Sequence, residues 1–253
     1  RIRGGMMNRG PKMSIFAALV FASAQCLLGQ QPATPGSLLA GSLVALGGAN
    51  IQQVTLTGTA EFIAGATDDT GSFTGNCAYG GSSRLSLSLS SASRTETRQV
   101  ANGTPSGTWS DGNSVSHAIV PHNLYAPAAW FCPVMALSQI VSAGNLNIQF
   151  VGNEEKDGAT LAHFTVTSVP PGTGPEFALF THLSQVDIFL DPQTSRPVVF
   201  DFNVHPDNNA LVDIPVEIRF SDYKQVNGVW TPFTVEKYVN STLALKLQVE
   251  SAS

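Results

Sequence analysis

Residues 214–250, IPVEIRFSDYKQVNGVWTPFTVEKYVNSTLALKLQVE, decide the fold class of this chain. Within them the apolar Val216 and Ile218 flank the charged Glu217, and residues 243–249 repeat the same two-residue period. Alternation with one polar face is typical of antiparallel strands, whereas a parallel sheet buried on both faces shows unbroken apolar runs. The stretch therefore predicts an antiparallel sheet.

Short turn sequences divide the C-terminal part of the chain into strands. Asn227–Gly228 is a strong hairpin signal because both residues tolerate positive φ. Asp191–Thr194 and Asn240–Ser241 are further turn sequences. The strands expected around these turns are 184–190, 197–204, 213–224, 229–239 and 242–250. This region is thus predicted to be a five-stranded meander.

Earlier parts of the chain repeat the alternation, for example at 54–62, 85–89 and 146–150. Together these patterns predict about eleven strands. Residues 35–47 and 133–143 break the alternation, and each begins with a proline that suits the first turn of a helix. We therefore expect a short N-terminal helix and a central helix in a mainly β protein.

The domain organisation is predicted to be simple. Residues 170–178 are rich in Pro and Gly and are expected to form a loop rather than a boundary. No repeat and no long linker is visible, so residues 31–253 are predicted to form one β domain. A single all-β domain of this length is common.

The first thirty residues have the order of a signal peptide. Residues 1–12 are basic, residues 13–24 are apolar, and the sequence then turns polar. We expect residues 1–30 to be a signal peptide, with a mature protein that is soluble and periplasmic or secreted. An uncleaved anchor and a lipid anchor at Cys26 are the alternatives.

The number and distribution of charged residues limit the classes of binding partner that we expect. Charged residues make up 12% of the chain, against about 25% in average soluble proteins. Four of the thirteen Lys and Arg lie in residues 1–12 and all eighteen Asp and Glu follow, so the remaining chain carries a net charge of about −9. Without a basic cluster, neither nucleic acid nor an anionic membrane surface is an expected partner.

After the leader the chain holds two cysteines, Cys77 and Cys132. In an oxidising compartment they could form one disulfide, worth roughly 4 kcal/mol for a loop of this length. Two buried free thiols fit the sequence equally well. Both alternatives stay open at this point.

No sequence motif of catalysis or metal binding is present. The chain has no GxSxG elbow, no phosphate-binding loop and no HExxH pair. His117 is expected at a strand end and His122 in the loop after it, and His205 begins an HPDNN stretch expected to face solvent. We therefore predict no enzyme activity, no catalytic residue, no metal and no cofactor. A hydrolase site assembled from distant strands is the remaining enzymatic alternative.

Large apolar side chains gather in residues 128–137 and on one face of the predicted sheet. A curved sheet partly closed by a helix would leave an apolar cleft for a hydrophobic guest. The alternative is that the helix fills the sheet and both form one core. The residues predicted to line the cleft are Trp130, Phe131, Met135, Leu137, Phe150, Phe200, Phe202 and Phe233.

The sequence also resembles the LolA/LolB-like superfamily of periplasmic outer-membrane lipoprotein carrier and sorting proteins. The strand that ends in Asp191–Pro192, then Phe220–Tyr223 and Val226–Phe233, carry the resemblance. Ser106–Trp109 and residues 128–131 are similar to stretches of secreted proteins of this type seen in acidobacteria. The resemblance covers nearly all of the mature chain, and its motifs are turns rather than reactive sites.

The resemblance implies an incomplete antiparallel β-barrel whose concave face is covered by the N-terminal and central helices. It also implies a carrier for a lipid or a lipoprotein acyl chain, although the arginine that closes the carriers' cavity has no counterpart that we can assign. We expect a monomer. The alternative function is a non-enzymatic envelope sensor or protein-interaction scaffold, with an envelope protein as its partner.

Overall fold

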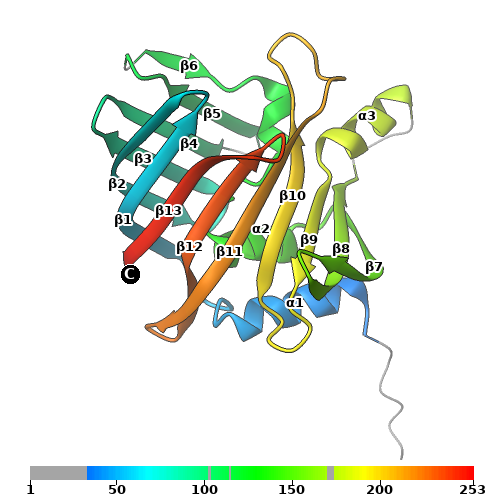
Figure 1. The fold of residues 1–253 in the computed structure, drawn as a ribbon. Coiled ribbons are helices and arrows are strands. Elements are labelled where there is room, and N and C mark those ends of the chain that lie inside the picture. Colours follow the sequence, from blue (N-terminus) through cyan, green and yellow to red (C-terminus); the bar gives the residue numbers. More distant parts are fainter. Residues whose placement is uncertain (1–32, 102–103, 114, 170–173) are drawn as a thin grey trace, which may run out of the picture. The chain divides into compact units, whose positions relative to one another are not determined.

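One antiparallel sheet organises the computed structural model, which describes residues 33–101, 104–113, 115–169 and 174–253 (Figure 1). The predicted signal peptide lies outside these residues. The thirteen strands found in the described ranges are β1 Gln53–Ala64, β2 Thr67–Ala78, β3 Ser82–Leu89, β4 Ser93–Ala101, β5 Thr104–Ser110, β6 Ser116–Ala118, β7 Leu146–Lys156, β8 Ala159–Ser168, β9 Val186–Leu190, β10 Pro197–Val204, β11 Ile214–Val226, β12 Val229–Val239 and β13 Thr242–Ala252.

The order of the strands explains why the barrel is incomplete. From β1 the chain steps outward strand by strand to β6, crosses to β7 at the opposite edge, and returns strand by strand to β13. There β13 pairs antiparallel with β1, so the first and last strands join the two halves of the sheet. Because β6 and β7 end the order without pairing to each other, the predicted incomplete barrel is confirmed, with thirteen strands rather than about eleven.

Three α-helices and one 3-10 helix accompany the sheet in the described part of the chain: α1 Pro35–Ala45, η1 Pro121–Tyr125, α2 Pro133–Ser142 and α3 Pro175–Leu183. Helices α1 and α2 confirm the two predicted helices. Helix α3 shows that the predicted loop over 170–178 is wrong for residues 175–178, whereas residues 170–173 lie outside the described residues. A proline occupies the first turn of α3, where no backbone N–H is needed, and Glu176 suits the positive end of the helix dipole.

The central helix fills the concave face of the sheet. Residues 133–138 of α2 are all buried, and residues 134–137 share one hydrophobic cluster with side chains of the strands. Phe131 packs where β2 carries Gly75, and a Cβ at Gly75 would lie only 2.7 Å from the Phe131 ring. Close packing of this kind supports the expectation that helix and sheet form one core.

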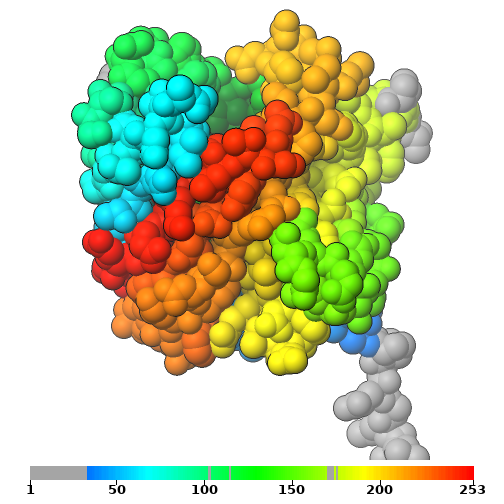
Figure 2. Space-filling model, in the orientation of Figure 1, coloured from blue at the N-terminus to red at the C-terminus, as the bar shows by residue number. Residues whose placement is uncertain are grey.

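The two faces of the sheet differ as the alternation predicts. On β11 the inward Val216, Ile218 and Phe220 are buried, whereas Glu217 and Arg219 point outward. Figure 2 shows the outer face, with β1 in cyan and β13 in red beside it. The two turn residues Asn227 and Gly228 have φ values of 51° and 86°, which confirms the predicted hairpin.

A membrane-spanning helix is not found in the described residues, because none of their helices is both long and apolar enough to cross a bilayer.

Candidate functional site

Two hollows lie on opposite faces of the sheet. We call the first the inner cavity; it has a volume of about 310 Å³ and lies on the face that packs against the buried segment before α2. The second, which we call the outer hollow, has a volume of about 420 Å³ and lies on the outer face of β9–β12. Their lining decides which of them suits a guest molecule.

Aliphatic and aromatic side chains from both halves of the sheet form most of the inner cavity. Strands β1, β3, β5 and β13 supply most of them, and their two-residue period places alternate side chains on this face. Trp130, from the segment before α2, closes one side and is only 3% exposed. The main apolar lining residues are Phe62, Leu85, Leu87, Trp109, Trp130 and Leu245.

One carboxylate, Glu96, lines the inner cavity, and it forms an ion pair with Arg98, which is outside the lining. The guanidinium of Arg98 on β4 lies 2.7 Å from Glu96 Oε1 and also donates to the Asn123 and Ala126 carbonyl oxygens. Burial tends to raise the pKa of Glu96, but the positive charges of Arg98 and Lys237 outweigh it and hold that pKa below its ordinary value. Glu96 is therefore ionised and committed to Arg98.

Two further cations border the inner cavity without such a partner. Arg94 and Lys237 make no ion pair within 4.0 Å with any residue in the described ranges. Arg94 lies 4.4 Å above the Phe62 ring and Lys237 lies 4.5 Å above the Trp130 ring. Burial, together with the charge of Arg98, lowers the pKa of Lys237 although Glu96 opposes this shift. The cavity thus carries positive charge in excess of its single carboxylate.

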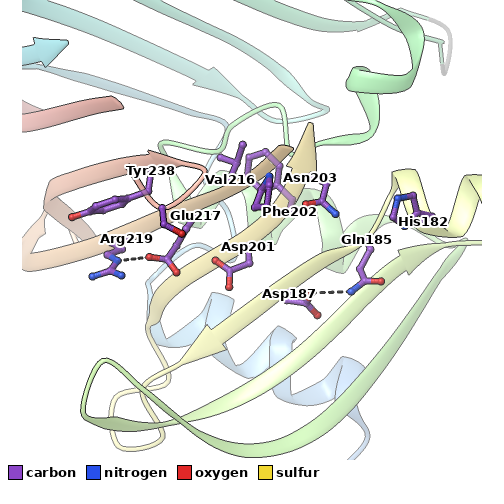
Figure 3. A pocket seen from close by; sticks show the side chains of 12 residues that line it. His182, Gln185, Asp187, Asp201, Phe202, Asn203, Val216, Glu217, Arg219 and Tyr238 are labelled. Carbon is purple, nitrogen blue, oxygen red and sulfur yellow. Dashed lines mark hydrogen bonds and ion pairs between the residues drawn. The ribbon is translucent and has the colours of Figure 1, made fainter. Parts of the chain in front are cut away.

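The outer hollow has a different composition (Figure 3). Lys156 lies 2.6 Å from Asp201 Oδ2 and 2.9 Å from Glu217 Oε2, and Glu217 also pairs with Arg219. Asp187 accepts hydrogen bonds from Thr165 and Gln185 and contacts His163. Each of its three carboxylates therefore has a cation or several donors within the chain, so this network needs no charged ligand.

The carboxylates of this network differ in pKa. Burial, with the nearby negative charges of Glu217 and Asp187, raises the pKa of Asp201 despite its bond to Lys156. Burial would also raise the pKa of Glu217, but its bonds to Lys156 and Arg219 hold that pKa below its ordinary value. The outer hollow is a balanced polar surface.

Of the eight residues predicted to line a cleft, only Trp130 lines the inner cavity. Phe202 borders the outer hollow. Phe131, Met135, Leu137 and Phe200 are at most 1% exposed and belong to the packed core. The remaining two differ: Phe150 on β7 is 45% exposed, and Phe233 is partly buried against the core.

Sequence reasoning missed Arg94, Glu96 and Lys237. Their strands alternate as expected, but charged residues at inward positions look like ordinary polar residues until the register of the sheet is known. The relevant signal in β4 was three charges at alternate positions, which places all of them on one face. In β12 it was the adjacent pair Glu236 and Lys237, which puts a charge on each face. A strand packed over one apolar core would avoid charge on its inner face.

The two cysteines meet inside the core. Cys77 on β2 and Cys132 at the start of α2 are both buried free thiols in this structure. Burial, with the hydrogen bond that the Cys77 thiol makes to the neighbouring Cys132 side chain, raises the pKa of Cys77 well above its ordinary value. Their contact fits either alternative, so the disulfide stays a prediction.

Comparison with known proteins adds evidence on the fold. No family model and no curated protein matches this sequence. A crystal structure of a DUF1329 family protein from Desulfovibrio piger is similar over 88% of this chain and 93% of that chain, with a TM-score of 0.56 and 11% identity.

Two further crystal structures overlap less closely. A domain assigned to outer membrane lipoprotein sorting, from Vibrio parahaemolyticus, covers 86% of this chain and 91% of its own, with 10% identity and a TM-score of 0.48. A LolA superfamily protein from Nitrosomonas europaea covers 85% of this chain and 92% of its own, with 12% identity and a TM-score of 0.47. At these identities a likeness concerns the fold alone, and the likeness to acidobacterial proteins in particular stays a prediction. The chain shares its fold with the DUF1329 family protein, and its own sheet is the incomplete antiparallel barrel that the sequence predicts.

Proposed function

We propose that this protein is an exported, non-enzymatic binding or carrier protein that holds a hydrophobic guest with an anionic group in the inner cavity. One observation carries the proposal: an apolar cavity is bordered by two cations, Arg94 and Lys237, that have no ion pair with the described residues. A cation removed from water without a counter-charge is costly, and an anionic ligand would remove that cost.

The size of the cavity suits one acyl chain or part of one. Its volume of about 310 Å³ is at the lower end of the range of roughly 300–1,000 Å³ that is usual for ligand sites. Burial of an acyl chain gains about 0.8 kcal/mol for each CH₂ group. Ten buried methylenes would supply roughly 8 kcal/mol before association costs, which leaves moderate affinity. The anionic group would then decide which amphiphiles are held.

The first test is the identity of the guest. Protein purified from a bacterial periplasm is weighed by native mass spectrometry, and its organic extract is analysed. We expect a fatty acid, an acidic lipid or an acylated peptide. A mass without guest, combined with no binding of dodecanoate, would refute the proposal.

The second test is the charge of the guest. Titration with dodecanoate and with dodecanol compares an anionic and a neutral head on the same chain. Because an ionised acceptor strengthens a hydrogen bond to Lys or Arg, we expect dodecanoate to bind at least about tenfold more tightly, equivalent to ~1.4 kcal/mol. Equal affinities would contradict the role of the cations.

A matched pair of variants assigns the effect to the cavity. Lys237→Met removes the inner ammonium, whereas Lys246→Met removes one that pairs with Glu236 on the outer face. We expect Lys237→Met to reduce the preference for dodecanoate over dodecanol, because Arg94 remains, and Lys246→Met to leave it unchanged. Loss of the preference in both variants would point to the net charge of the protein instead.

The alternative function, an envelope sensor or interaction scaffold, has its own supporting observation. Strand β7 is an edge of the sheet, and its Phe150 and Val151 are 45% and 52% exposed. An exposed apolar edge can accept a strand from another protein. Recovery from periplasm of a stoichiometric protein partner that Phe150→Ser releases, with no lipid guest, would favour this function over the carrier.

A further inference from the structure

Two histidines and one aspartate meet at one end of the sheet, although the sequence separates them. His182 lies in the last turn of α3, His205 directly follows β10, and Asp213 directly precedes β11. One ligating atom from each of the three lies within 4.8 Å of those of the other two. Such a convergence of nitrogen and oxygen ligands raises the question of a metal ion.

Spacing of the ligand atoms suits a small tetrahedral cation. His182 Nε2 lies 2.8 Å and His205 Nδ1 lies 3.4 Å from the same atom, Asp213 Oδ1. Ligands placed 2.0–2.1 Å from a tetrahedral zinc ion lie about 3.3 Å from each other. Two imidazoles and a carboxylate are also common zinc ligands, and three protein ligands leave a fourth position for water.

His205 is held in place before any metal binds. Its backbone N–H donates to Asn123 Oδ1 at 2.8 Å, and its carbonyl oxygen accepts from Asn123 Nδ2 at 2.8 Å. The side chain of His205 is fully buried. This corrects the prediction that His205 faces solvent, because η1 and the 205–213 connection pack around it.

One nitrogen of the buried His205 ring has no partner among the described residues. Nδ1 lies 3.1 Å from the Val212 carbonyl oxygen, whereas Nε2 is buried without a hydrogen bond to any described residue. Buried polar atoms are nearly always satisfied, and an orphaned one points to an unseen water or ion. The unsatisfied atom is Nε2, whereas the atom spaced from Asp213 as a ligand would be is Nδ1, so the two observations concern opposite nitrogens of one ring. The convergence of the three side chains is therefore the observation that carries the site.

From these observations we propose that His182, His205 and Asp213 form a binding site for a divalent transition-metal ion of the zinc class. The proposal is independent of the carrier function and departs from the sequence-based expectation of no metal. The ion would tie α3 to the connection between β10 and β11. Because His182 also borders the outer hollow, the site would lie at one end of that hollow (Figure 3).

The test is a titration of the chelator-treated protein with Zn²⁺ by calorimetry, followed by Co²⁺ with its visible absorption as a report on geometry. We expect one ion per chain and the absorption of a tetrahedral Co²⁺ site. His182→Ala and Asp213→Asn alter partly exposed side chains and should leave the fold intact. Each should weaken binding by more than the roughly 10–100-fold that is typical for loss of an outer-shell partner.

His117→Ala is the matched control, because His117 also stands beside an aspartate, Asp111, at 3.5 Å. We expect this variant to bind Zn²⁺ as the unaltered protein does. Absence of Zn²⁺ binding, or equal binding by His182→Ala and the unaltered protein, would overturn the proposal.

Discussion

The inner cavity and the outer hollow differ in whether their charged side chains have partners of opposite charge. In the outer hollow Lys156 contacts both Asp201 and Glu217, and hydrogen-bond donors surround Asp187. In the inner cavity Arg94 and Lys237 lie over aromatic rings without a carboxylate of their own. The outer hollow is the larger of the two. The two hollows therefore differ more in the charge that the described residues leave unpaired than in volume.

The largest loss of folding stability is expected for substitutions in the packed part of the inner face. Phe131→Ala leaves a void beside Gly75 that β2 cannot fill, and we expect it to lower the free energy of unfolding by about 3–5 kcal/mol. Phe150→Ala, at an exposed position, should lower it by less than about 1 kcal/mol. Urea denaturation measures both values. Similar losses would mean that the inner face is loosely packed, and the distinction between core and cavity would fail.

Substitutions of Lys156 and Lys237 are expected to change folding stability by an intermediate amount and in different directions. Lys156→Met leaves Asp201 and Glu217 close together without their shared cation, and should lower the free energy of unfolding by about 1–2 kcal/mol. Lys237→Met removes an unpaired cation from an apolar site, and should leave stability unchanged or raise it by up to about 1 kcal/mol. The midpoints of urea denaturation show the signs. Equal destabilisation would mean that Lys237 has a structural partner.

The smallest effects concern two of the three carboxylates of the outer hollow, Asp201 and Glu217. The raised pKa of Asp201 means that its ionisation opposes folding. Its contribution to the free energy of unfolding therefore falls as pH rises from its ordinary pKa of 3.8 through its pKa in the folded protein. The lowered pKa of Glu217 means that it stabilises the fold above its ordinary pKa of 4.5, and that this contribution is lost as pH falls through the folded value.

We therefore expect Asp201→Asn and Glu217→Gln to differ in sign at pH 7. Asp201→Asn should leave stability unchanged or raise it, and Glu217→Gln should lower it, each by less than about 1 kcal/mol because both sites are partly solvated. The Glu217→Gln difference should vanish in acid. Thermal unfolding between pH 3 and pH 7 measures this, and equal losses at pH 7 would contradict the assigned pKa directions.

The fold was largely predictable because its signals are local. The alternation in β11 and β13 and the Asn227–Gly228 turn depend only on neighbours in sequence, and they placed five C-terminal strands within a few residues. Helix α3 was missed because the Pro- and Gly-rich residues before it resemble a loop. Its own signals, Pro175 and Glu176 in the first turn, occupy the end of that stretch.

The candidate sites were mostly not predictable because they depend on contacts between distant segments. Trp130 was identified from its size and apolar neighbours, but the cations beside it come from β4 and β12. Likewise, His182 and His205 meet only because α3 and the end of β10 lie together in space. A single sequence shows residue types and their periods, but it does not show which strands become neighbours in the sheet.

The pairing of β1 with β13 has a consequence for how the chain folds. Leu56 lies opposite Ala252, so the central ladder of the sheet connects residues from the two extremes of the domain. Contacts so distant in sequence form slowly, because a long loop must close before they are gained. While the C-terminal residues are still being synthesised, the central ladder cannot exist. A nascent chain in this state remains incompletely folded until its last strand is available.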